Sequence, residues 1–204
     1  PGRLPPVDPT RAQASGAIMF ANRLRKNLEA TTKWARKEGI SCFRVYDADM
    51  PEYSFAIDLY GTANGKDRYA YVQEYAAPQT VAEEKVRTRR AEAVAILPAT
   101  LGLADDFIWF KTRRHRRGGD QYTKLGGAEV FHEVDENGLR FLVNFDDYLD
   151  TGIFLDHRLT RARLQTMARG SRFLNLFGYT GTATVNAAAG GAVTTTTVDM
   201  SRTY

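Results

Sequence analysis

Hydrophobic positions recur with two different periods along the N-terminal part of the chain. Apolar side chains at helical spacing predict a helix over residues 17–37, which Gly39 would end, and a second helix over residues 81–97. Short apolar runs rich in aromatic and β-branched residues predict strands. The expected strands cover residues 42–46, 55–59, 69–75, 107–111, 129–132 and 139–144. Because Asn64-Gly65 separates two of these strands, we expect a hairpin there, within an α+β unit.

The pattern changes after Asp156. A helix is expected over residues 158–167, then an apolar strand over 172–177, a turn with two glycines, an alanine-rich helix and a strand over 193–198. This order is typical of the start of a parallel, doubly wound sheet. The β-branched run at residues 194–197 suits a buried strand. The predicted fold class is therefore α/β: a small α+β subdomain followed by the first strands of an open sheet.

Composition restricts the possible classes of protein. With 204 residues, of which 43% are hydrophobic and 25% charged, the chain can bury a core and is neither disordered nor collagen-like. Its one cysteine, Cys42, and three scattered histidines predict no metal site. No apolar run reaches the ~20 residues of a membrane span and no signal peptide opens the chain, so a cytoplasmic location is expected. Residues 1–16 contain four prolines and are expected to form a linker or an extended arm.

Basic side chains are segregated, which the net charge of +4 conceals. Residues 11–37 contain seven lysines and arginines against one acidic residue, and residues 111–124 contain six against one. Such segregation is typical of proteins that bind a polyanion, and the alternative is a pair of solvated faces. An arginine cluster next to Gly118-Gly119 favours the first interpretation, because phosphates would relieve the repulsion among guanidiniums. The cluster consists of Arg113, Arg114, Arg116 and Arg117.

The turn between the strands of the second unit has features of a nucleotide-binding site. Its two glycines permit a tight turn and a close approach of ligand to backbone, although the motif is neither G-x-G-x-x-G nor a P-loop. The aspartate at the end of the next strand could accept hydrogen bonds from both ribose hydroxyls of an adenosine. An ordinary turn with a helix-capping aspartate is the alternative. The candidate residues are Asn175, Phe177, Gly178, Tyr179, Thr180, Gly181 and Asp199.

An acidic segment over residues 146–158 precedes this unit. Its carboxylates and aromatic faces could hold a cationic ligand, with Arg158 binding a carboxylate end. The alternative is a solvated acidic loop in which His157 is a capping or packing residue.

Several long segments resemble a single family. They are FANRLRKNL, WARKEGISCFRVYDADMPEYSFAIDLYG, VQEYA, DQYTKL, FLVNFDDYLDTGIFLDHR, FLNLFGYTGTATV and TTTVDMSRTY, and they extend from about residue 18 to the end of the chain. The chain is similar to the K portion of the bacterial ribosomal RNA large subunit methyltransferase K/L, a fusion of two enzymes that modify guanines.

This resemblance implies a division of the chain and a set of ligands. Residues 17–150 would form an RNA-facing α+β subdomain, and residues 151–204 the start of a class I, Rossmann-like methyltransferase domain that the chain leaves incomplete. The methyl donor S-adenosylmethionine would lie against the turn at residues 177–181, with its ribose on Asp199. The segment that would close over the donor includes Thr151, Phe154 and Arg158. Large-subunit ribosomal RNA would contact the arginine cluster, and residues 1–16 would link to a fused upstream methyltransferase half.

The implied reaction is methylation of a guanine, with N7 as the expected atom. Because N7 carries an exposed lone pair, no general base is needed and catalysis would consist mostly of positioning. The resemblance places the base-binding motif downstream of Tyr204, so no catalytic residue is assigned. Two departures from the pattern stand out: the commonest class I turn has a glycine where Phe177 and Tyr179 stand, and Gly178 replaces the usual alanine of the family, which is expected to loosen the turn slightly.

Two alternatives remain at this stage. The chain could be a noncatalytic RNA-binding fragment of such an enzyme that lacks a completed donor site and base site. It could also be a related methyltransferase that acts on cytosine, which would require a thiolate nucleophile. Cys42 lies far upstream of the donor turn, which argues against the cytosine enzyme.

Overall fold

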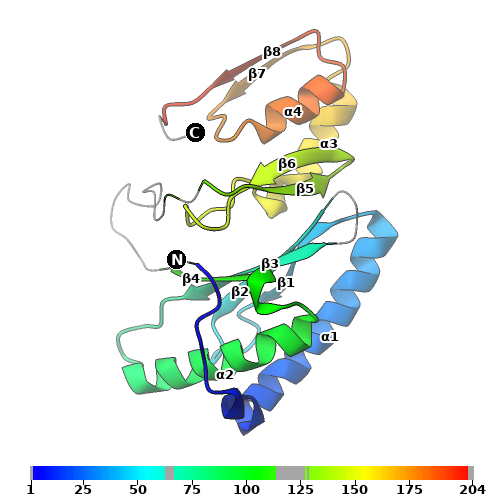
Figure 1. The fold of residues 1–204 in the computed structure, drawn as a ribbon. Helices are drawn as coiled ribbons and strands as arrows, with labels where there is room; N and C mark the ends of the chain where they lie inside the picture. The colour runs from blue at the N-terminus through cyan, green and yellow to red at the C-terminus, as the bar shows by residue number, and fades with distance from the viewer. Residues whose placement is uncertain (1, 63–66, 114–126, 128, 202–204) are drawn as a thin grey trace.

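The computed structural model describes residues 2–62, 67–113, 127 and 129–201. Figure 1 shows these residues arranged in layers: two long helices, a four-stranded sheet, a two-stranded hairpin, and a second unit of two strands and two helices. The helices are α1 (Ser15–Glu38), α2 (Glu83–Leu101), α3 (Arg158–Met167) and α4 (Thr182–Ala189). The strands are β1 (Cys42–Asp47), β2 (Phe55–Gly61), β3 (Arg68–Tyr75), β4 (Ile108–Arg113), β5 (His132–Glu136), β6 (Leu139–Val143), β7 (Arg172–Leu176) and β8 (Thr194–Val198).

The four-stranded sheet has the strand order β1-β2-β3-β4. β1, β2 and β3 pair antiparallel, whereas β3 and β4 pair parallel because α2 carries the chain back across the sheet. The antiparallel pairing of β2 with β3 confirms the predicted hairpin strands, and the Asn64-Gly65 turn lies outside the described residues. α2 extends one turn past its predicted end, since Leu101 is buried in the core.

One face of the sheet packs against α1 and α2. Of the apolar positions that predicted α1, Phe20 and Leu24 are fully buried against the sheet, Leu28 is partly buried, and Trp34 is exposed. Phe20 stacks on Tyr53 with ring centroids 4.6 Å apart. α1 ends at Gly39, whose φ of 66° is the left-handed conformation that glycine adopts without strain.

The hairpin β5–β6 covers the other face of the sheet and encloses a second core that contains Trp109 and Phe145. β5 begins at His132, three residues later than predicted, so the expected strand over 129–132 is wrong. Asn137 and Gly138 both have positive φ and form a tight turn that pairs Glu136 with Leu139. This turn fixes which residues face each other, and the strand therefore lies over 132–136.

The second unit contains β7 and β8 as a parallel pair with α4 between them in sequence. The predicted strand–helix–strand order is confirmed. The predicted burial of residues 194–197 is wrong, because all five residues of β8 are exposed. Within the described part of the chain β8 has a single neighbouring strand, β7, so its β-branched side chains have little to pack against.

The N-terminal segment lies along the free edge of β4. The Phe110 amide donates to the Gly2 carbonyl, and the Arg3 guanidinium lies 4.1 Å from the centre of the Trp109 ring. A short 3-10 helix, Pro9–Gln13, follows and leads into α1. The arm thus covers part of an edge that would otherwise expose unpaired backbone groups.

Candidate donor turn and adjoining cleft

The turn between β7 and α4 has a strained backbone. Phe177 and Tyr179 have φ values of 60° and 51°, and Gly181 has 75°. The amide of Gly178 donates to the Val198 carbonyl at 3.0 Å, which ties the turn to the end of β8. The two aromatic residues that depart from the commonest class I pattern therefore occupy left-handed conformations that favour glycine. Non-glycine residues adopt such conformations rarely, in tight turns and at functional sites, where the surrounding structure holds them.

Gly178 lies against β8. A Cβ atom added at this position would come within 2.2 Å of the Thr197 Cγ2 methyl. Thr197 is also fixed by a 2.6 Å hydrogen bond between its hydroxyl and that of Thr184 in α4. The side chain of Thr197 thus occupies the volume that an alanine methyl at residue 178 would need.

Asp199 is connected directly to the turn. Its Oδ2 accepts a hydrogen bond from the Tyr179 amide at 2.7 Å, and its Oδ1 accepts one from the Ser201 amide at 2.7 Å. These hydrogen bonds, that of Ser201 first, lower the pKa of the exposed carboxyl below its ordinary value. Asp199 is therefore ionised at neutral pH, and each oxygen keeps a lone pair that can accept from a ligand hydroxyl.

The segment over residues 151–158 lies beside this turn. The Thr180 hydroxyl donates to the Gly152 carbonyl at 2.6 Å, and the rings of Phe154 and Tyr179 are 5.0 Å apart. Two stretches that the sequence marked separately are thus brought together by the fold.

A buried ion pair holds this segment in place. Arg161 of α3 donates to both carboxylate oxygens of Glu136 at 2.5 and 2.8 Å, and it also donates to the Phe154 carbonyl at 2.8 Å. Both side chains are almost completely buried. Neither residue is among the predicted site residues. Glu136 ends β5 next to a polar turn and Arg161 lies in a short charged helix, and no local pattern indicates that the two would pair.

Three of the predicted donor-site residues make side-chain contacts away from the turn, and two of them, Thr151 and Arg158, also line the cleft described below. Thr151 is buried, and its hydroxyl lies 3.0 Å from that of Tyr60. Asn175 donates to the Thr184 hydroxyl of α4 at 3.0 Å. Arg158 lies over the Trp34 ring of α1 at 5.4 Å and donates to the Cys42 carbonyl at 3.4 Å. The contacts of Thr151 and Arg158 join the segment over residues 151–158 to the four-stranded sheet and α1, whereas that of Asn175 stays within the second unit.

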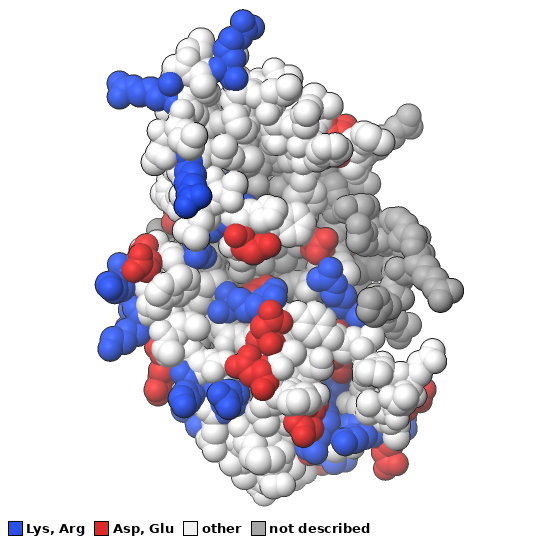
Figure 2. Space-filling view, turned by 180° about the vertical axis from the view of Figure 1, so that it is seen from behind, with Lys and Arg blue, Asp and Glu red and all other residues white. Residues whose placement is uncertain are grey.

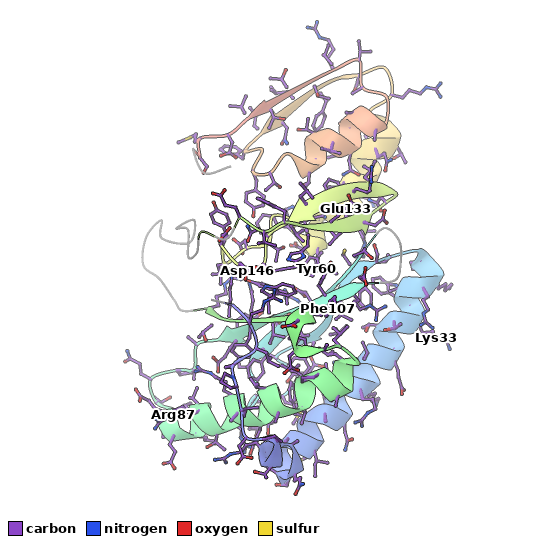
Figure 3. The ribbon with its side chains drawn as sticks, in the orientation of Figure 1. Lys33, Tyr60, Arg87, Phe107, Glu133 and Asp146 are labelled. Carbon is purple, nitrogen blue, oxygen red and sulfur yellow. The ribbon has the colours of Figure 1, made fainter. Side chains whose placement is uncertain are left out.

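A cleft of about 730 Å³ opens between the four-stranded sheet and residues 150–158. Its lining combines aromatic rings, among them Trp34, Tyr71 and Phe154, with charged groups of both signs. Figure 2 shows acidic and basic side chains side by side across the middle of this face. Tyr60 lies in the layer between the sheet and the segments above it (Figure 3). Phe154 belongs both to the cleft lining and to the contact with the donor turn, so the two sites adjoin.

The basic residues are only partly described. Arg113 is exposed at the end of β4 and lines the cleft. Arg114, Arg116 and Arg117 lie outside the described residues. The basic side chains of the first segment are all exposed, on α1 or just before it: Arg11, Arg23, Arg25, Lys26, Lys33, Arg36 and Lys37.

None of the helices described is long and apolar enough to cross a membrane. Among the residues that the structure describes, no group of three or more His, Cys, Asp and Glu side chains is placed to hold a metal ion.

Comparison with known proteins relates this arrangement to other chains. The chain is 54% identical over 201 residues to "Ribosomal RNA large subunit methyltransferase K/L" of Allochromatium vinosum, covering 98% of this chain and 27% of that protein. It is 55% identical over 191 residues to the protein of the same name from Methylococcus capsulatus, covering 94% of this chain and 26% of that one. The chain thus spans about a quarter of the length of these curated relatives.

Solved structures of similar shape are described as methyltransferases. A putative SAM-dependent methyltransferase from Streptococcus mutans matches with a TM-score of 0.69 and 27% identity over 91% of this chain and 46% of that one. A putative methyltransferase, SMU.776, complexed with SAH matches with a TM-score of 0.64 and 27% identity over 89% of this chain and 45% of that one. The family model of S-adenosylmethionine-dependent methyltransferases matches residues 63–204. The chain therefore belongs to the S-adenosylmethionine-dependent methyltransferase family, whose fold and cofactor its two units were expected to share.

Proposed function

We propose that this chain is the donor-binding and RNA-facing part of an enzyme that methylates N7 of a guanine in large-subunit ribosomal RNA. The observation that carries the proposal is the junction of Asp199, the Tyr179 turn and the segment over residues 151–158. The shared name of the relatives, which are 54% and 55% identical, supports ribosomal RNA as the substrate.

The residues of the turn fit S-adenosylmethionine. Asp199 is ionised, exposed and fixed by two backbone amides, as a carboxylate that accepts from ribose hydroxyls needs to be. The adjoining rings of Phe154 and Tyr179 offer apolar faces, and Phe154 is 41% exposed. Gly181 has open space where a side chain would lie, so a ligand can approach its backbone closely.

The proposed methyl transfer requires little from the side chains beyond positioning of the two reactants. When bound, S-adenosylmethionine supplies a methyl group on a positively charged sulfur. The N7 lone pair of guanine forms the new bond as the carbon–sulfur bond breaks, and no proton has to be removed. The cleft and turn would hold the two reactants in line and exclude water, which is the main source of acceleration when no acid or base takes part.

The two parts of the chain would then have different binding roles. We assign RNA contacts to the subdomain over residues 17–150, with the exposed basic residues of α1 and the arginine cluster against phosphates. Residues 151–204 would bind the donor, and the whole would act in the cytoplasm, where ribosomal RNA is modified.

The test uses the full-length protein that carries this chain. Calorimetry with S-adenosylhomocysteine measures donor-site binding, and Asp199→Ala is expected to weaken it at least about tenfold, the scale of a lost hydrogen bond to a charged group. Asp105→Ala removes an exposed carboxylate far from the turn and serves as the control. Unchanged affinity in the Asp199 variant would remove this residue from the site.

A second measurement tests the substrate. Large-subunit ribosomal RNA lacking the modification is incubated with the protein and methyl-labelled donor, then reduced with borohydride and treated with aniline, which cleaves RNA at N7-methylguanosine. One new cleavage site is expected. Labelled RNA without cleavage would exclude N7, and absence of both donor binding and labelling would favour a noncatalytic RNA-binding role.

A further inference from the structure

Two opposite charges face the cleft without pairing. Asp150 and Arg113 both line it, yet neither side chain makes a hydrogen bond or ion pair with another described residue. Burial raises the pKa of Asp150, and the positive charge of Arg113 opposes that rise. A half-buried carboxylate without a donor loses hydration that no protein group replaces. A ligand in the cleft that supplies donors to Asp150 and an acceptor to Arg113 would satisfy both groups.

Asp150 is held firmly by its neighbours in sequence. Tyr71 and Gln73 of β3 both donate to the Leu149 carbonyl, at 2.6 and 2.9 Å. Lys111 of β4 donates to the carbonyls of Asp146 and Tyr148, at 2.9 and 2.5 Å. Three polar side chains of the sheet thus fix the loop that ends at Asp150. Because the backbone before Asp150 is already fixed, a ligand that binds Asp150 does not have to order this loop.

This pair of charges matches one nucleobase edge. Guanine presents two adjacent donors, N1–H and the exocyclic amino group, next to the acceptor O6. Adenine and cytosine present one donor there, and uracil one donor between two acceptors. A carboxylate accepts from both guanine donors at once, and a neighbouring guanidinium donates to O6.

We propose that the cleft binds the target guanine by its Watson–Crick edge, with Asp150 accepting from N1–H and the amino group and Arg113 donating to O6. This inference rests on the proposed function and assigns the substrate's recognition to named residues. It distinguishes Arg113 from the rest of the arginine cluster, which would contact phosphates.

The arrangement leaves the reacting atom free. N7 lies on the opposite edge of guanine from N1 and the amino group, so a base held this way turns N7 outward. Phe154 lines the same cleft, is 41% exposed, and packs on Tyr179 of the donor turn. A base in the cleft would therefore lie next to the residues that are expected to hold the donor.

Guanosine and inosine monophosphates provide the sharpest test, because they differ only in the exocyclic amino group. Binding of each to the full-length protein saturated with S-adenosylhomocysteine is measured by ligand-detected NMR. We expect the parent to bind the guanine nucleotide about tenfold more tightly, since a hydrogen bond between a charged group and a donor is worth about that factor. Asp150→Asn is expected to bring the ratio to about one. Arg113→Gln is expected to weaken the binding of both nucleotides by a similar factor, because both carry O6.

Controls separate the possible failures. Asp105→Asn, outside the cleft, should leave both affinities unchanged, and the Asp150 variant should still bind S-adenosylhomocysteine as the parent does. If the parent binds S-adenosylhomocysteine but shows equal or undetectable affinity for the two nucleotides at millimolar concentration, the base-recognition proposal is overturned and the proposed function survives. If the parent does not bind S-adenosylhomocysteine, both are overturned. Should Asp150→Asn fail to fold, the exposed Arg113 still tests the proposal: unchanged affinities in that variant contradict it.

Discussion

β2 and β8 are both short strands with strong β-sheet propensity, yet every residue of β2 is buried and every residue of β8 is exposed. β2 has a neighbouring strand on each side, helices over one face and the hairpin over the other. β8 has β7 on one side and contacts α4. The comparison shows that the number of layers around a strand decides its burial here, while its composition decides only that it is a strand.

Hydrogen exchange should show the largest difference between these regions. We expect amides of β2 and β3 in the 204-residue chain to exchange slower than those of β7 and β8 by a factor on the order of 10³, because a two-stranded sheet with exposed side chains opens locally. Mass spectrometry of peptic fragments measures this. Equal protection of the two pairs of strands in a monomeric chain would contradict the expected difference between these regions.

The buried Glu136–Arg161 pair joins the hairpin to the second unit. Glu136→Gln should lower the free energy of unfolding by about 3–5 kcal/mol, because it leaves a buried guanidinium without its carboxylate. Glu133→Gln is the matched control on the same strand, since Glu133 makes a longer, exposed contact with Arg140 at 3.6 Å (Figure 3). Its expected effect is below about 0.5 kcal/mol. Urea unfolding followed by tryptophan fluorescence measures both, and equal effects would refute a special role for Arg161.

One substitution made in both regions sharpens the comparison. Leu59→Ala in β2 should cost about 2–5 kcal/mol through lost burial and a cavity. Leu176→Ala in β7 should change stability by no more than about 0.5 kcal/mol, since Leu176 is 57% exposed. Thermal and urea unfolding provide the values. A large loss in the Leu176 variant would mean that β7 is covered by something the present arrangement does not contain.

The turn of the second unit should be sensitive to added volume. Gly178→Ala places a methyl group against Thr197 Cγ2 and is expected to destabilise the β7–β8 pair by about 1–3 kcal/mol. Thr197→Ser removes that methyl and keeps the hydroxyl that bonds Thr184, so the double variant should recover most of the loss. Local hydrogen-exchange rates of the β8 amides measure the change in stability. If the destabilisation of the double variant equals the sum of those of the two single variants, the contact between residues 178 and 197 does not cause the loss.

The last expected effect concerns pH and belongs to the first region. Burial lowers the pKa of Lys111 to about 8, so between pH 8 and 10.5 the unfolded chain binds more protons than the folded one, and this residue alone makes stability rise with pH. Burial raises the pKa of Cys42 to about 12, which makes stability fall from pH 9 upward.

Lys111→Met should therefore show a steeper loss of stability between pH 8 and 10.5 than the parent. Lys33→Met, at an exposed position of α1, is the control and should follow the parent (Figure 3). Urea midpoints across this range test the prediction, and parallel curves for all three proteins would show that Lys111 does not titrate in it.

The order and type of nearly all elements could be predicted from the sequence. Helical periodicity placed α1, and short apolar runs rich in aromatic and β-branched residues placed the strands of the first sheet and of the second unit. The exception is β5, whose position depends on the tight Asn137-Gly138 turn and its pairing with β6.

The sequence also determined the two stretches that we propose bind the donor, the turn at residues 175–181 with Asp199 and the segment at 151–158, since glycines, aromatics and acids at those positions are local signals. Only the tertiary structure decided that they touch, through Thr180 with Gly152 and Phe154 with Tyr179. The tertiary structure likewise decided that Glu136 pairs with Arg161 and that Asp150 and Arg113 line the same cleft, although these residues are far apart in the chain. Local sequence specifies backbone conformation and periodicity. Contacts between distant residues depend on how whole layers pack, and no single segment encodes this packing.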